Sequence, residues 1–83
     1  MFYQAKYIIH DDMTPVVFPE TLAHVDVAYN MFGGKEKISG AGFCVYHSSE
    51  GWICYGESIS LKIKSNGDAD GKILNKMLGG ARQ

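Results

Sequence analysis

The clearest alternation of apolar and polar positions lies between Ser39 and Lys64, on both sides of a short polar segment. The apolar residues that share one parity are Ala41, Phe43 and Val45 before this segment, and Ile53, Tyr55, Ile59, Leu61 and Ile63 after it. A period of two on both sides of a polar turn is typical of a β-hairpin with one buried face. The pattern therefore predicts a central hairpin over about residues 39–64 whose apolar parity faces the core and the helices.

The turn at Ser48-Ser49-Glu50 predicts which residues of the two strands face each other. With a three-residue loop, the facing pairs are His47 with Gly51, Val45 with Ile53, Cys44 with Cys54, and Phe43 with Tyr55. A slip by one residue would move every apolar side chain to the other face, so the alternation also fixes the register.

Glu57 interrupts the alternation because it has the parity of Tyr55 and Ile59. Burying an unpaired carboxylate is too costly for a small domain. Either Gly56 forms a β-bulge that turns Glu57 outward, or Glu57 is buried and held by a cation or by backbone donors. The bulge is favoured, because a glycine inside a strand often marks one.

Two extended segments precede the hairpin. Residues 2–9 are rich in β-branched and aromatic side chains, which predicts a first strand. Pro15-Val16-Val17-Phe18-Pro19 is shorter, and its prolines have no N–H to donate, so it belongs at a sheet edge or in an ordered loop. A polar loop with His10, Asp11 and Asp12 lies between them.

Two other segments have apolar residues at steps of three and four, which predicts helices over about residues 21–32 and 66–78. The first helix begins at Thr21 or nearer His24, and Gly33-Gly34 ends it. Its apolar positions are Leu22, Val25, Tyr29 and Phe32, with a second match at Val25, Ala28 and Phe32. The second begins with Ser65 and Asp68 in a capping-box arrangement, and its sheet-facing residues are Ile73, Leu74, Met77 and Leu78.

The predicted order of elements is strand, edge strand, helix, hairpin and helix. This order indicates an α+β fold, in which an antiparallel sheet of three to four strands packs against two helices. The 83 residues are enough for one domain, residues 1–83, with a thin core.

Charge and composition exclude several partners. The net charge of −1 argues against general electrostatic binding to nucleic acid, and no apolar run approaches the roughly 20 residues of a membrane span. Two cysteines suit an intracellular protein with reduced thiols better than a disulfide scaffold.

One segment resembles a calcium-binding loop. Asn66, Asp68 and Asp70 occupy the first, third and fifth positions of an EF-hand pattern, but the twelfth position is Met77 where a bidentate glutamate is needed. A plain helix start is the favoured interpretation, and the histidines show no local ligand pair, so we expect no metal and no cofactor.

The sequence favours a non-enzymatic protein. Cys44 and Cys54 lie in the middle of strands, and no nucleophile lies on a sharp turn beside a helix start. Ten aromatic residues exceed what so thin a core hides, which favours a protein-binding surface. The candidate residues are Trp52, Lys62 and Lys64 on the outward parity of the hairpin, and His10, Asp11 and Asp12 in the loop. The alternatives are a small metal- or nucleic-acid-binding accessory protein and a homodimer formed through edge strands.

The stretches Val17-Phe18-Pro19-Glu20, His24, Ala28, 39–43, Cys54-Tyr55-Gly56-Glu57-Ser58-Ile59-Ser60-Leu61 and 65–78 carry a resemblance that covers most of the chain. In them the chain resembles a family of small uncharacterised proteins from tailed-phage and prophage genomes. The family has no agreed activity, so the resemblance implies no catalytic residues. It implies a phage origin and expression in the host cytoplasm. By analogy, small phage proteins often bind host or phage proteins, including as anti-CRISPR inhibitors of bacterial defence.

Overall fold

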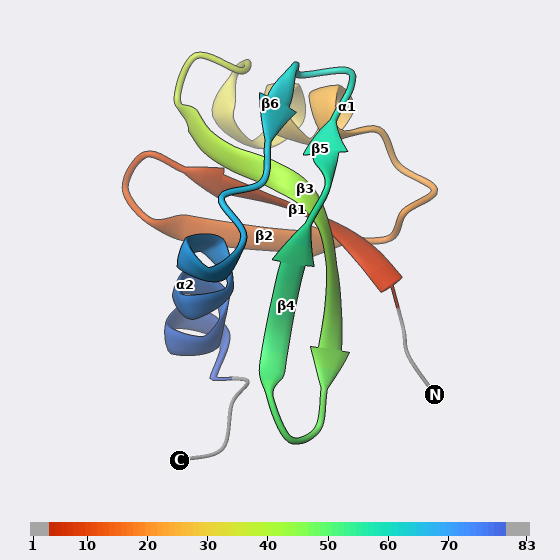
Figure 1. Cartoon of the computed structure of the whole chain (residues 1–83). Coiled ribbons are helices and arrows are strands. Elements are labelled where there is room, and N and C mark those ends of the chain that lie inside the picture. Colours follow the sequence, from red (N-terminus) through yellow and green to blue (C-terminus); the bar gives the residue numbers. More distant parts are fainter. Residues whose placement is uncertain (1–3, 80–83) are drawn as a thin grey trace.

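The computed structural model describes residues 4–79 (Figure 1). The elements in chain order are β1 (Gln4–His10), β2 (Thr14–Phe18), α1 (His24–Phe32), β3 (Ile38–His47), β4 (Gly51–Tyr55), β5 (Glu57–Ser58), β6 (Ile63–Lys64) and α2 (Asp68–Leu78). The predicted start of the first strand at Phe2 lies outside the described residues.

A four-stranded antiparallel sheet forms the centre of the fold, in the order β2-β1-β3-β4. Two helices pack on it, so the predicted α+β class is confirmed. β2 lies at one edge, as the prolines of this segment predicted. The short strands β5 and β6 form a second sheet of two strands. Figure 1 shows the β3–β4 hairpin extending well beyond the other strands, with its tip at the bottom of the view.

The predicted register of the hairpin is confirmed. The structure pairs Phe43 with Tyr55, Cys44 with Cys54, Val45 with Ile53, and His47 with Gly51. The N–H of Glu50 donates to the carbonyl of His47 over 3.2 Å, which closes the turn. Gly51 has a φ of 81°, a left-handed conformation that glycine adopts without steric cost.

The two helices cover opposite faces of the sheet. Ile8 of β1 packs with Val27 and Ala28 of α1, whereas its neighbours Tyr7 and Ile9 lie in a second cluster with Leu74 of α2. Since successive residues of a strand point to opposite faces, these two clusters are separate cores. The prediction that one parity of the hairpin faces both helices is therefore wrong.

Beyond Ala41, which is buried as predicted, the buried face of the hairpin is the opposite of the predicted one. Cys44 and Cys54 are buried in the α2 cluster, whereas Ile53 and Tyr55 on the other parity are 37% and 39% exposed. Helix α1 has nine residues and packs at the Ala41 end of this parity. The hairpin extends past the helix, so its outer residues have no cover among the described residues (Figure 1).

The return strand does not run unbroken to Lys64, contrary to the prediction. β4 ends at Tyr55, Gly56 has a φ of 77°, and the chain leaves the main sheet to form β5 and β6. Glu57 is exposed, so the expectation that it turns outward is confirmed, although by a change of sheet. In the turn that follows, Ile59 is 82% exposed and Leu61 is buried.

Helix α1 begins at His24, the later of the two predicted starts, and ends at Gly33 in a left-handed conformation. Its buried residues are His24, Val27 and Ala28. The predicted core positions Leu22, Val25 and Tyr29 are exposed. Helical spacing gave more than one apolar stripe in this segment, and packing against Ile8 selected the stripe with the small Ala28.

Helix α2 begins after Gly67. No side chain caps this end of the helix, so the predicted capping box of Ser65 and Asp68 is wrong. Of the predicted sheet-facing residues, Leu74 is buried, Ile73 is half-buried, and Met77 and Leu78 are exposed. Gly71 explains how closely α2 approaches the sheet. A Cβ there would lie 3.0 Å from the carbonyl oxygen of Trp52, so glycine lets α2 approach β4 closely.

Candidate functional site

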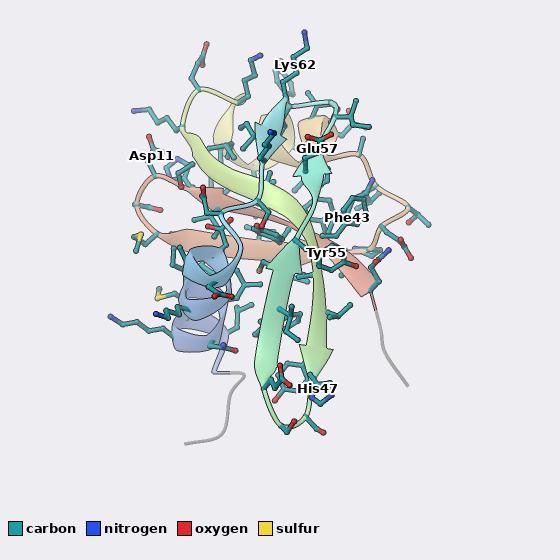
Figure 2. The ribbon with its side chains drawn as sticks, viewed as in Figure 1. Asp11, Phe43, His47, Tyr55, Glu57 and Lys62 are labelled. Atoms are coloured by element: carbon teal, nitrogen blue, oxygen red, sulfur yellow. The ribbon has the colours of Figure 1, made fainter. Side chains whose placement is uncertain are left out.

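Four apolar side chains form a continuous patch on the uncovered side of the β3–β4 hairpin. Phe43 pairs with Tyr55 and Val45 pairs with Ile53, and we call these four residues the outer hairpin face. The rings of Phe43 and Tyr55 stack with centroids 6.2 Å apart. Figure 2 shows these two residues together on the hairpin, with Glu57 above them and His47 at the tip. Its contiguous, partly exposed apolar side chains make this face a candidate interaction surface.

The outer hairpin face is anchored to the core by a row of aromatic rings. Phe18 meets His24 edge to face at 5.5 Å, and His24 meets Phe43 edge to face at 6.0 Å. Phe18 and His24 are buried. The Tyr55 hydroxyl is hydrogen-bonded to the side-chain oxygen of Gln4 on β1. These contacts hold the exposed rings in one position, which lowers the entropic cost of binding a partner.

A hollow of about 330 Å³ adjoins the outer hairpin face. Its lining residues are Lys6, Ala23, His24, Phe43, Glu57, Ile59 and Ser60. They come from β1, the start of α1, β3, and the β5–β6 segment, so four parts of the chain build it. The hollow combines an apolar lining with a few polar groups, as ligand-binding sites do.

Two polar groups of the hollow, His24 and Lys6, are hydrogen-bonded to backbone carbonyls. His24 Nε2 is 2.8 Å from the carbonyl oxygen of Gly42, and because a carbonyl only accepts, this nitrogen carries the proton. Burial, with a further contribution from Lys6, lowers the pKa of His24 below its ordinary value. The Lys6 ammonium donates to the carbonyl of Leu22 over 2.8 Å and lies 6.0 Å from the centroid of Phe43.

The predicted binding residues do not come together. Trp52 is half-buried on the α2 side of the hairpin, and its backbone N–H donates to Asn75 Oδ1 over 2.8 Å. Lys62 and Lys64 are exposed on the β5–β6 segment. Figure 2 shows Lys62 at the top of the molecule and Asp11 at the left, both away from the Phe43–Tyr55 pair.

His10 is the last residue of β1, and Asp11 and Asp12 lie in the turn between β1 and β2. The His10 ring stacks on Phe32 with centroids 4.4 Å apart, and its Nδ1 lies 3.0 Å from Asp12 Oδ1. Hydrogen bonds from Thr14 and His10 lower the pKa of the exposed Asp12 carboxyl. These contacts stabilise the turn, and Asp11 contributes its backbone N–H to the carbonyl of Lys37.

The calcium-loop residues have a structural role in the described part of the chain. Asp70 is buried and accepts hydrogen bonds from the Tyr7 hydroxyl at 2.5 Å and from the Asn66 backbone N–H at 2.9 Å. Asn66 Nδ2 donates to Asp70 Oδ1 over 3.1 Å, and Asp68 is exposed. Over residues 4–79, no three His, Cys, Asp or Glu side chains form a group that could hold a metal ion.

Cys44 and Cys54 face each other across the hairpin as free thiols. Burial raises the pKa of each thiol to about 12, so neither is a thiolate at neutral pH. We expect Ellman's reagent at pH 8 to label them at least roughly a hundredfold more slowly in the folded protein than in urea, because the thiolate is the reactive form. Rapid labelling of either thiol in the folded protein would contradict the burial seen here.

The outer hairpin face and the hollow were missed at the sequence level because Phe43, Ile53 and Tyr55 have the alternation of buried residues. The apolar parity alone does not show whether a helix covers it. Length was the one available signal, because a helix over residues 21–32 spans about 18 Å, whereas a strand over residues 39–47 spans about 30 Å.

Comparisons with protein-family models, with curated proteins and with solved structures gave no significant match to this chain. Among the described residues, no helix has both the length and the apolar character needed to cross a bilayer.

Proposed function

We propose that this chain is a non-enzymatic binding protein that attaches to another protein through the outer hairpin face. The observation that supports the proposal is a set of core-like side chains, including an aromatic pair, left 37–39% exposed at Ile53 and Tyr55 on a rigid hairpin. Aromatic anchors surrounded by apolar contacts are the residues that contribute most to binding at protein interfaces.

The partner in this proposal is a host or phage protein in the bacterial cytoplasm, and the consequence of binding is inhibition of a defence complex. The resemblance to small phage proteins supports this part, as an analogy at the level of the family. The small size and the exposed apolar face suit an inhibitor that acts by covering a surface of its target.

A single substitution tests the surface. In Ile53→Lys, the alkyl stem keeps much of the packing while the ammonium adds a charge to the outer hairpin face. We expect affinity for the partner to fall by roughly 30-fold or more, the effect of losing an interface hot spot. Quantitative pull-down from bacterial lysate measures this, with wild type and variant as parallel baits. Components of a CRISPR or other defence complex among the lost proteins would support inhibition.

Met77→Lys on α2 is the matched control, because Met77 is also exposed but lies on the helix that covers the opposite face. It should recover the same proteins as the wild type. Equal recovery by Ile53→Lys would contradict the proposal. Light scattering gives a second outcome: a wild-type dimer that Ile53→Lys converts to a monomer would show that a second copy of the chain occupies the face.

A further inference from the structure

The hollow beside the outer hairpin face has the size and lining of a site for one ring. At about 330 Å³, it lies at the lower end of the roughly 300–1,000 Å³ typical of small-molecule pockets. Phe43 and Ile59 supply apolar walls, and Ile59 is 82% exposed, so its side chain is available for contact. A single aromatic side chain suits this space better than an extended ligand does.

One ring nitrogen of His24, a lining residue of the hollow, has unused hydrogen-bonding capacity. His24 is 3% exposed and Nε2 is committed to the Gly42 carbonyl, which leaves Nδ1 as an acceptor in the neutral ring. No hydrogen bond within residues 4–79 engages this Nδ1. Since no buried polar side-chain atom of the described residues lacks a hydrogen-bond partner, Nδ1 keeps contact with solvent, and a donor from a bound group would take the place of that solvent.

The charged groups of the hollow oppose each other in sign. Lys6 carries one positive charge and Glu57 one negative charge, and His24 between the elements is neutral at pH 7. The Lys6 ammonium uses one of its three protons on the carbonyl of Leu22 and has others to donate. An ionic ligand would therefore meet a like charge in the hollow, whereas a neutral group that both donates and accepts would meet complementary partners.

We propose that the hollow binds a tyrosine side chain of the partner protein. The ring packs against Phe43 and Ile59, the phenol proton goes to His24 Nδ1, and the phenol oxygen accepts from Lys6. Tyrosine fits better than phenylalanine, which has no hydroxyl, and better than tryptophan, whose indole N–H donates but does not accept. This inference rests on the proposed function, because it assigns the chemistry of the residue that the partner presents.

Titration of the full chain with N-acetyl-L-tyrosinamide, followed by two-dimensional amide NMR, tests the inference. We expect shift changes centred on Phe43, Ile59 and Ser60. N-acetyl-L-phenylalaninamide should bind at least about fivefold more weakly, because it lacks the hydroxyl that makes one hydrogen bond to His24 and one to the Lys6 ammonium. Equal affinity for the two amides, or shift changes outside the hollow, would overturn the assignment of tyrosine.

Two variants complete the test. Ile59→Ser removes an apolar wall at a position so exposed that the fold is not expected to change, and it should weaken tyrosinamide binding severalfold. Met77→Ser on α2 should leave binding unchanged. If neither amide binds while Ile53→Lys still loses the partner in pull-down, the inference fails and the proposed function stands. If tyrosinamide binds in the hollow but Ile53→Lys recovers every partner, the proposed function fails instead.

Discussion

Replacement of Asp70 with alanine is expected to lower the free energy of unfolding by about 3 kcal/mol or more, a large part of the 5–15 kcal/mol typical of a small domain. Asp70 is 2% exposed and accepts from Tyr7 and from both nitrogens of Asn66. Since a carboxylate only accepts, the Tyr7 proton goes to Asp70, and the Ser65 hydroxyl donates to Tyr7 in turn. The truncation leaves the buried Tyr7 hydroxyl and the donors of two part-buried hydrogen bonds from Asn66 without their acceptor.

Urea unfolding followed by Trp52 fluorescence and circular dichroism measures this loss. Asp68→Ala is the matched control, because it removes an exposed carboxylate from the same helix turn and should cost less than about 1 kcal/mol. Tyr7→Phe combined with Asp70→Ala should give less than the sum of the single effects, since the residues share one hydrogen bond. The hydrogen bonds that join Asp70, Tyr7, Ser65 and Asn66 form the Asp70 network. A loss of stability in Asp70→Ala no larger than that in Asp68→Ala would contradict the stabilising role of this network.

The same network explains the behaviour of the Tyr7 hydroxyl. Burial and the hydrogen bond to Asp70 raise the pKa of Tyr7 far above its ordinary value, so the phenol keeps its proton at all physiological pH values. The network therefore holds the start of α2 against β1 through a phenol that stays protonated.

Gly42→Ala is expected to destabilise the fold by about 3 kcal/mol, at the upper end of the cost of overpacking. A Cβ at this position of β3 would lie 2.6 Å from the carbonyl oxygen of Tyr55 and 3.1 Å from the Cβ of Ser65. The first of these atoms belongs to the backbone of the paired strand, so no rotamer change relieves the clash. The shift in the midpoint of urea unfolding measures the effect.

Ser39→Ala is the control for this substitution, because Ser39 is an exposed residue of the same strand. This substitution should lower the free energy of unfolding by less than about 1 kcal/mol, because only the 3.3 Å hydrogen bond from the Ser39 hydroxyl to the carbonyl of Ile9 is lost. A Gly42→Ala midpoint equal to that of Ser39→Ala would show that β3 and β4 separate easily at this point.

The glycines of β3 and the Asp70 network bear on function because they decide which face of the hairpin is covered. Gly40 faces the Asp70 carboxylate, and a Cβ at Gly40 would lie 2.6 Å from Asp70 Oδ2. Close approach of residues 65–70 and of α2 buries Cys44 and Cys54. On the opposite face, α1 and the β5–β6 segment cover the Ala41 end of the hairpin, and the outer hairpin face stays exposed.

The register and the boundaries of several elements could be predicted from local rules. The polar turn and the parity of Phe43 and Tyr55 determine the pairing, because a slip by one residue inverts every side chain. Gly33 and Gly79 end the helices in left-handed conformations, and Pro15 places its strand at an edge. The exposure of Glu57 also followed from the cost of burying a carboxylate.

The sequence by itself determined the α+β class, the hairpin pairing and the ends of the helices, since these depend on backbone geometry and on neighbours along the chain. Only the tertiary structure decided which parity of the hairpin is buried. Both parities carry side chains that suit a core, and the choice depends on where Gly71 and Asp70 let α2 dock and on how far α1 reaches. The candidate site follows from that choice, because the hollow is built from four parts of the chain that meet only in the folded protein.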